Sequence, residues 1–431
     1  MAARSVLVAT AEPDATAELD ATAEDDPLDL EAARAYLAAA ALRSAPVGRV
    51  GLELERHVID LARPTAIVGW ARLQRALRGV ALSGGSRLTL EPGGQVELST
   101  PTADGVAAAV QGLQLDDRVL RAALTDARLG LLGLGADPLR PPVMLHAADR
   151  YASMASYFAA AGHQRDGNAM MCSTASLQLN LDAGGASAWA DRVAHVHRVG
   201  PALVALASCS PLLAGRETGR WGNRQSIWQR LDPGRCAPHL GRGEPAASWA
   251  AFALAAPVMM VRLPGSGRPA PVRERVPLVD WCAGRRRLGG RRPTAADLDL
   301  HLSTLWPPLR LRGWLEVRLL DAVPSQWWPG LAAIVATVID HPGSAARAAA
   351  AAEPVADRWS DAARLGIRDP ALLAAARGVV SAALTAAPAS LRSTVEAWAT
   401  LLERGRTPAH LVLDRARRDG PAACLTAPEL S

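Results

Sequence analysis

The sequence predicts an α+β protein with a mainly antiparallel β-sheet, flanking helices and a helical C-terminal part. Four short runs alternate polar and apolar side chains, which is typical of strands with one covered face. Longer stretches repeat apolar residues at intervals of three or four, which indicates amphipathic helices. With 431 residues, of which 49% are hydrophobic, the chain is long enough to enclose a large core.

The chain begins with an acidic segment that we expect to be disordered. Residues 1–31 contain nine acidic side chains and one basic side chain, Arg4. Residues 1–28 carry too few large apolar side chains to pack, so we expect a tail at 1–28 and a single domain at 29–431. Charges or prolines interrupt every apolar run, and acidic residues follow too early for a secretory signal. We therefore expect a cytoplasmic protein with no membrane partner.

Apolar periodicity and Gly-Pro-Arg-rich composition divide the rest of the chain into helices and loops. The Arg-rich run Gly284–Arg292 lies in one such loop, where it is either a solvated surface segment or a cover over a polyphosphate. Helices are expected near residues 28–43, 103–128, 148–161, 186–207, 247–256, 295–305, 328–340, 370–386 and 389–404, and loops at 211–222, 231–245 and 263–293.

The four strand-like runs share one property, a face made of large polar or charged side chains. A single polar face is also what any half-exposed antiparallel sheet shows. Glutamate and asparagine form strands poorly, however, so their repeated presence favours a functional sheet surface. The polar faces are Glu53, Glu55 and His57 in run 51–57; Gln95, Glu97 and Ser99 in run 95–99; Thr174, Ser176, Gln178, Asn180 and Asp182 in run 174–182; and Arg310, Arg312, Glu316 and Arg318 in run 309–319.

Carboxylates gathered on such a surface would repel one another unless cations neutralised them. Oxygen ligands of this kind select Mg²⁺ or Mn²⁺, and Mg²⁺ usually joins protein carboxylates to substrate phosphates. The chain contains no lysine, so all 47 basic residues are arginine. This excludes a P-loop lysine or a Schiff-base lysine, and it leaves arginine to meet phosphate charge. The residues alone therefore indicate a metal- and phosphate-dependent enzyme.

The cysteines and histidines give no sign of a separate site. The five cysteines are widely spaced and form no CxxC pair, so reduced thiols are expected. No second histidine stands at a ligand spacing from any of four candidates, so structural roles are expected for all of them. These candidates are His57, His146, His163 and His301.

Five stretches in these regions resemble the plant and proteobacterial type of glutamate–cysteine ligase. The likeness is closest to the actinobacterial branch that supplies γ-glutamylcysteine for ergothioneine synthesis. It implies a glutamine-synthetase-like fold, in which a curved antiparallel sheet forms a funnel flanked by helices. It also implies that ATP and Mg²⁺ serve a ligation of glutamate to cysteine through an acyl phosphate. The stretches are Gly51–Glu55, Leu90–Thr100, Met171–Asp182, Arg224–Arg235 and Gly313–Asp321.

The resemblance also implies roles for individual residues, with glutamate, cysteine and ATP as the small-molecule partners. The stretch Ser208–Pro211 departs from the Asn-Ser-Pro of many relatives, and this leaves the choice of amine open. The implied roles are Mg²⁺ binding by Glu53, Glu55, Glu97 and Glu316; catalysis by Arg318 and Glu316; nucleotide binding by Arg310, Arg312 and Arg318; and substrate binding by Gln178, Asn180, Arg224 and Arg235.

Three other functions remain as alternatives. A ligase that joins glutamate to a different amine would use the same residues. A metal-dependent hydrolase would act without ATP. An arginine-rich nucleic-acid-binding protein is disfavoured, because acidic strand faces repel a phosphate backbone and the basic residues are scattered.

Overall fold

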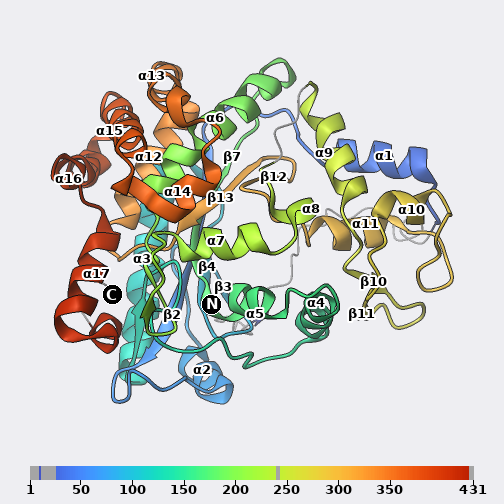
Figure 1. Ribbon diagram of the computed structural model, residues 1–431, viewed down its shortest axis with the longest axis horizontal. Helices are drawn as coiled ribbons and strands as arrows, with labels where there is room; N and C mark the ends of the chain where they lie inside the picture. The colour runs from blue at the N-terminus through green and yellow to red at the C-terminus, as the bar shows by residue number, and fades with distance from the viewer. Residues whose placement is uncertain (1–8, 11–25, 239–242, 427–431) are drawn as a thin grey trace, which may run out of the picture.

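A long central strand organises the β-sheet of this protein. The computed structural model describes residues 9–10, 26–238 and 243–426, and within them the predicted α+β class is confirmed (Figure 1). Neighbouring strands are antiparallel except for the first pair. The order across the sheet is β1 (Ala9–Thr10), β3 (Arg87–Leu90), β4 (Val96–Ser99), β2 (Arg49–Asp60), β7 (Ser176–Leu181), β13 (Leu315–Asp321) and β12 (Leu309–Leu311), while β5 (Ala103–Asp104) and β6 (Leu129–Leu132) pair with the two ends of β2.

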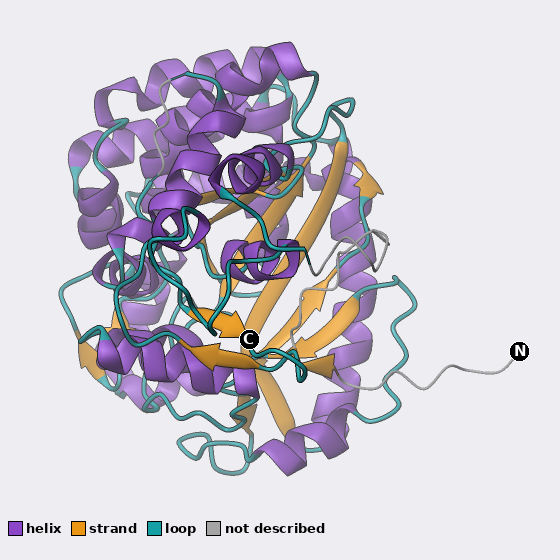
Figure 2. Cartoon of the chain, turned by 90° about the vertical axis from the view of Figure 1, so that its right-hand side faces the viewer, coloured by secondary structure: helices purple, strands orange, loops and turns teal. Residues whose placement is uncertain are grey.

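Helices enclose the sheet and make up the whole C-terminal part (Figures 1 and 2). All of the predicted helical stretches are helical, and further helices occur between them. The longer helices are α1 (Leu30–Ala39), α2 (Trp70–Leu77), α3 (Gly105–Asp126), α4 (Asp149–Ala160), α5 (Gln164–Ser173), α6 (Trp189–Ala207), α7 (Asn223–Arg230), α9 (Pro245–Ala255), α11 (Ala295–Leu302), α12 (Trp328–Asp340), α13 (Pro342–Ala352), α14 (Trp359–Leu365), α15 (Pro370–Leu384), α16 (Arg392–Glu403) and α17 (Pro408–Asp419).

The segments expected to be loops contain short regular elements. They are β8 (Leu212–Leu213) with β9 (Arg216–Glu217), α8 (Pro233–Cys236), β11 (Pro269–Pro271), which pairs with β10 (Met260–Arg262), and α10 (Leu278–Cys282). Most of the expected tail, residues 1–8 and 11–25, lies outside the described residues. No helix among the described residues is long and apolar enough to cross a membrane.

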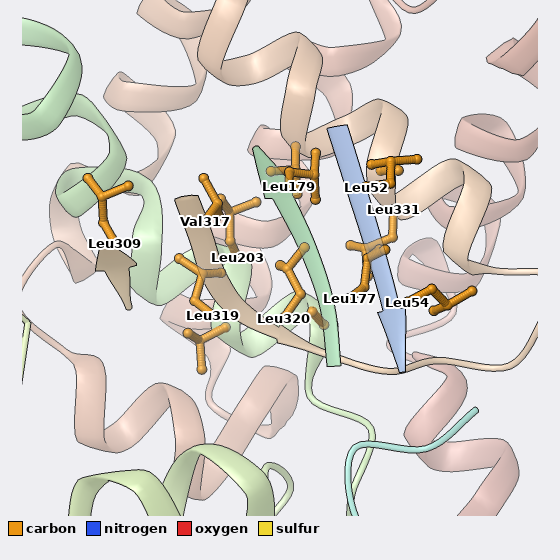
Figure 3. Packing of buried hydrophobic residues seen from close by; sticks show 14 of the residues in the cluster. Leu52, Leu54, Leu177, Leu179, Leu203, Leu309, Val317, Leu319, Leu320 and Leu331 are labelled. Carbon is orange, nitrogen blue, oxygen red and sulfur yellow. The ribbon is translucent and has the colours of Figure 1, made fainter. Parts of the chain in front are cut away.

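The alternation within the strands separates an apolar face from a polar one. Leu52 and Leu54 of β2 lie beside Leu177 and Leu179 of β7, and all four are fully buried (Figure 3). Leu203 of α6 and Leu331 of α12 belong to the same cluster. Burial of this face anchors the sheet, because each fully buried leucine contributes about 1.5–3 kcal/mol. The opposite, polar face is thereby held in a fixed register.

The prediction of one continuous strand over residues 309–319 is wrong. This run instead forms the hairpin of β12 and β13, in which Arg310 lies opposite Glu316. Gly313 makes the turn with φ = +84°, a conformation that favours glycine. The turn is bonded to the segment that follows α1, because the N–H of Gly313 donates to the carbonyl of Ala41 at 2.8 Å and the Arg43 N–H donates to the carbonyl of Gly313 at 2.9 Å.

Candidate active site

The polar face of the sheet forms the floor of a cavity of about 530 Å³. Strands β2, β3, β4, β7, β12 and β13 supply the floor, and helices α4, α5 and α7 supply part of the wall. Most of the polar positions predicted from alternation reach this cavity, including Gln95, Ser99, Thr174, Ser176 and Asp182. His57 does not, because its ring turns away and its Nε2 lies 3.1 Å from the Leu134 carbonyl. Burial lowers the pKa of His57 to about 4, so it remains neutral.

Four glutamates converge in the middle of the cavity. Glu55, Glu91 and Glu97 each place a carboxylate oxygen within 4.8 Å of the others. Glu53 is next along the same face of β2 and pairs in register with Ser99, while Glu55 pairs with Glu97. We call Glu53, Glu55, Glu91 and Glu97 the carboxylate cluster.

Burial and mutual repulsion make the carboxylate cluster costly to ionise without a cation. Burial, followed by the charges of Glu316 and Glu97, raises the pKa of Glu53 to about 7. Burial is also the main cause that raises the pKa of Glu55 and of Glu97. The pKa of Glu91 is raised well above its usual range by burial and by the neighbouring Glu97 and Glu55. Such a set favours a bound cation, which would offset both the loss of hydration and the repulsion.

Glu91 is the member that the alternation of the strands did not reveal. It follows the last residue of β3, at the start of the turn Glu91–Gln95, so it belongs to no alternating run. The turn requires its glycines: Gly94 has φ = +85°, and a Cβ on Gly93 would lie 2.4 Å from the carbonyl oxygen of Cys172. Glu91 nevertheless lies within the stretch Leu90–Thr100, so the motif itself carried the signal.

Glu316 differs from the cluster, because arginines already neutralise it. It is fully buried under the cavity floor, and both of its oxygens accept hydrogen bonds from Arg310. Nη1 of Arg318 adds a third bond at 2.8 Å. Although burial acts in the opposite direction, these guanidinium groups hold the pKa of Glu316 well below its usual range. The expected repulsion of Glu316 by the other carboxylates is therefore already offset within the protein.

Arg318 lies on the same face of β13 as Glu316, next to a break in strand register. Between Val317 and Leu320 the pairing of β13 with β7 shifts, so that one extra residue lies in β13. A bulge of this kind bends a strand locally. The Arg318 guanidinium then reaches both Glu316 and the Oε1 atom of Gln178. Arg310, Arg312 and Arg318 all line the cavity, as the nucleotide-binding prediction requires.

Three of the four predicted substrate-binding residues also line the cavity: Gln178, Asn180 and Arg224. Asn180 donates to Glu53 at 2.9 Å and accepts from Trp314 at 2.7 Å. Arg224 is 3% exposed; its Nη2 donates to the carbonyl of Arg318 at 3.1 Å, and its Nη1 forms an ion pair with Asp321 at 3.8 Å. A guanidinium at a cavity wall is suited to a carboxylate ligand.

Arg235 lies elsewhere, so its predicted contact with a substrate carboxylate does not fit the structure. Its side chain is fully buried, and its guanidinium donates to Thr304 and to the carbonyl of Pro257. The ring of Tyr157 lies 4.9 Å from the guanidinium carbon. Arg235 thus holds the wall of the cavity together instead of facing it. The sequence could not reveal this, because the partners come from three distant segments.

The remaining candidates have structural roles. His301 is buried and contacts the Ala253 carbonyl, and His146 stacks on Trp70. All five cysteines are buried free thiols. The Arg-rich run is an ion-paired surface loop, since Arg285 bonds to Asp280 and Arg286 to Glu274, and none of its residues lines the cavity.

Comparisons with known proteins agree with the motifs. Residues 49–427 match the model of glutamate–cysteine ligase family 2. The chain is 46% identical over 398 residues to glutamate–cysteine ligase EgtA of Mycolicibacterium smegmatis, covering 92% of this chain and 93% of that relative. It is 44% identical to EgtA of Mycobacterium tuberculosis, with the same coverage of both chains. It is 26% identical to the chloroplastic glutamate–cysteine ligase of Brassica juncea, over 72% of this chain and 63% of that relative. A solved glutamate–cysteine ligase of Francisella tularensis in complex with AMP overlays with a TM-score of 0.49 at 12% identity, covering 90% of this chain and 88% of that chain.

Proposed function

Because this chain belongs to glutamate–cysteine ligase family 2, we propose that it joins the γ-carboxylate of L-glutamate to the amine of L-cysteine with consumption of ATP. The structural observation that supports this most strongly is the cavity floor. It combines a carboxylate cluster able to hold cations with arginines able to meet phosphate charge, on one rigid sheet face. The product would be γ-glutamylcysteine, used for ergothioneine or another low-molecular-weight thiol.

The carboxylate cluster fits Mg²⁺. Its donors are all carboxylate oxygens, three of them lie within 4.8 Å of one another, and the pKa of each of its members is raised. Oxygen donors are the ligands that Mg²⁺ prefers. Bound Mg²⁺ would supply positive charge to the phosphates of the nucleotide. We propose Glu53, Glu55, Glu91 and Glu97 as ligands, with Glu316 contributing through the lone pairs that Arg310 and Arg318 leave open.

In the proposed reaction an oxygen of the glutamate γ-carboxylate attacks the γ-phosphorus of ATP. The bond from that phosphorus to the β,γ-bridging oxygen breaks and ADP leaves. Arg318 and Arg310 face this position, fixed by Glu316, and stabilise the charge of the transferring phosphoryl group. Such pre-organised charge requires no rearrangement at the moment of transfer.

The amine of cysteine then attacks the carbonyl carbon of the acyl phosphate. The carbon–oxygen bond breaks, phosphate leaves, and the nitrogen gives up a proton to solvent. Arg224 lines the cavity wall, where its guanidinium would hold an amino-acid carboxylate. The cavity walls of α4, α5 and α7 limit the access of bulk water to the acyl phosphate, which water would otherwise hydrolyse.

One experiment tests the proposed function and its alternatives together. ADP formation is measured with Mg²⁺, ATP and glutamate, with each of the twenty amino acids in turn as acceptor, and products are identified by mass. We expect ADP and γ-glutamylcysteine in equal amounts with cysteine. ADP formation with another amine alone would identify a different carboxylate–amine ligase. Hydrolysis of a substrate without ATP would indicate a hydrolase.

A further inference from the structure

Asp321, the last residue of β13, is a fully buried carboxylate that the proposed reaction does not use. Its Oδ2 atom accepts hydrogen bonds from the N–H of Cys209 at 2.9 Å and from the hydroxyl of Ser210 at 2.7 Å. Its Oδ1 atom faces Nη1 of Arg224 at 3.8 Å. A Cβ on Gly135 would lie 2.3 Å from the Oδ2 atom, so the backbone closes tightly around the carboxylate. Asp321 is therefore held in one orientation, with Arg224 on its open side.

Ser210 joins this carboxylate to the start of α7. Its hydroxyl donates to Asp321 and accepts from the backbone N–H of Arg224 at 3.2 Å, while its carbonyl accepts from the N–H of Asn223 at 3.2 Å. The residue before α7 is Gly222, which has no side chain to cap the first N–H groups of the helix. Ser210 supplies the cap from a distant segment and so fixes the turn of α7 that carries Arg224.

The bulge in β13 holds the other side of the Arg224 guanidinium. Arg318 and Leu319 have no pairing partner on β7. Their carbonyls accept instead from the side chains of α7, namely from Nη2 of Arg224 at 3.1 Å and from Nε2 of Gln225 at 2.9 Å. The guanidinium of Arg224 thus lies between the Arg318 carbonyl and Asp321, at the wall of the cavity.

Asp321 also offsets the charge of Arg224 in its buried position. Burial lowers the pKa of Arg224, and the charges of Asp321 and then Glu55 act in the opposite direction. Glu55 is a proposed Mg²⁺ ligand, so a bound cation would compete for its charge. The separation of 3.8 Å between Arg224 and Asp321 exceeds that of a hydrogen bond. Asp321 therefore attracts the guanidinium and still leaves it able to bind a substrate carboxylate.

We propose that Asp321 and Ser210 are positioning residues that set the Arg224 guanidinium for the carboxylate of an amino-acid substrate. This inference rests on the proposed function, which supplies that substrate. Neither residue lines the cavity, so both act through Arg224. The same contacts explain how the stretch Ser208–Pro211, which lies outside the cavity, can influence the amino-acid site.

The test measures kcat and the KM values of glutamate, cysteine and ATP for the full chain and its variants. Asp321→Asn keeps the shape of the side chain and removes its charge. It should raise one amino-acid KM about tenfold, more than it lowers kcat, and leave the KM of ATP within about twofold. The affected amino acid should be the one whose KM rises in Arg224→Lys. The double variant should be no worse than Arg224→Lys alone, because both changes disturb one interaction.

Two matched controls separate positioning from loss of stability. Asp116 is a buried carboxylate outside the cavity that accepts two backbone N–H bonds. Asp116→Asn should lower the melting temperature and leave both amino-acid KM values within about twofold. Ser210→Ala should raise the same KM as Asp321→Asn. Ser208→Ala should not, because the Ser208 hydroxyl donates to the Val204 carbonyl at 2.8 Å and does not reach Asp321.

The outcomes distinguish this inference from the proposed function. An active Asp321→Asn variant that melts lower but keeps both amino-acid KM values would overturn the inference alone, since Asp321 would then be purely structural. Additive effects of Asp321→Asn and Arg224→Lys, or an equal rise of KM in Asp116→Asn, would also overturn it. A wild-type protein that forms no γ-glutamylcysteine would overturn the proposed function and this inference with it. Thermal unfolding shows whether each variant is folded, and Ser210→Ala decides by the same criteria if Asp321→Asn is not.

Discussion

Arg310 and Glu316 face each other across the β12–β13 hairpin and form a two-point ion pair beneath the floor of the cavity. The pair links the hairpin to the phosphoryl site, because Glu316 also holds Arg318. Removing one partner of a buried ion pair leaves an uncompensated charge and typically costs about 3–5 kcal/mol. Glu316 is therefore needed for the geometry of two arginines at once.

We predict that Glu316→Gln abolishes ligation and also lowers the melting temperature. The amide keeps the shape of the side chain but removes the charge that offsets Arg310 and Arg318. Activity assays and thermal unfolding without added metal provide the measurement. A variant that melts at or above the wild-type temperature would show that Glu316 is repelled by the other carboxylates instead of being neutralised by arginine.

For Arg318 we predict that substitution by lysine lowers kcat much more than it weakens glutamate binding. Nη1 of Arg318 donates to both Gln178 and Glu316, and lysine keeps a positive charge but lacks the planar guanidinium that can meet a phosphoryl group at two points. Steady-state kinetics with glutamate as the varied substrate gives both constants. An unchanged kcat with a raised KM would assign Arg318 to ground-state binding.

Glu91→Gln should have the opposite effect on stability from Glu316→Gln. Burial and neighbouring carboxylates dominate the surroundings of Glu91, so removing its charge relieves repulsion when no cation is bound. We expect the variant in EDTA to melt about 2 °C higher than wild type, which corresponds to roughly 1 kcal/mol. The rise in melting temperature that Mg²⁺ causes in the wild type should be reduced, and ligation should be lost.

Glu403→Gln, an exposed position on α16, is the control for that measurement. It should change neither the melting temperature in EDTA nor the response to Mg²⁺. Normal ligation by Glu91→Gln at ordinary Mg²⁺ would remove Glu91 from the metal site.

Substitution by lysine should mainly reduce stability at Arg235 and mainly weaken substrate binding at Arg224. Arg235→Lys is expected to lower the melting temperature strongly, because lysine cannot reproduce the bonds to Thr304 and Pro257. Arg224→Lys is expected to raise the KM of an amino-acid substrate at least tenfold with a smaller loss of stability. If Arg235→Lys kept the wild-type melting temperature and raised an amino-acid KM, the substrate role for Arg235 would be restored.

The polar sheet face was predictable because alternation is a local property of a strand. Glu53, Glu55 and Glu97 reach the cavity because the leucines between them are buried on the other side. The hairpin at Gly313 was missed because its three-residue turn preserves the same alternation, so that Arg310 and Glu316 share a face in either arrangement.

Other features depend on contacts between distant segments, which alternation does not record. The burial of Arg235 depends on Pro257 and Thr304, and the orientation of His57 depends on the Leu134 carbonyl. The bulge at Arg318 could have been suspected from Leu319 and Leu320, since two adjacent apolar residues break the alternation there.

The most direct test of the proposed mechanism follows the oxygen that activation removes from glutamate. A carboxylate is a poor acyl donor until one oxygen is phosphorylated, so that oxygen should leave with the phosphate. Glutamate labelled with ¹⁸O in its γ-carboxylate is incubated with ATP, Mg²⁺ and cysteine, and the released phosphate is analysed by mass spectrometry. We predict one ¹⁸O atom in phosphate for each γ-glutamylcysteine formed. Formation of γ-glutamylcysteine with unlabelled phosphate would contradict the acyl phosphate and the role of Arg310 and Arg318 in phosphoryl transfer.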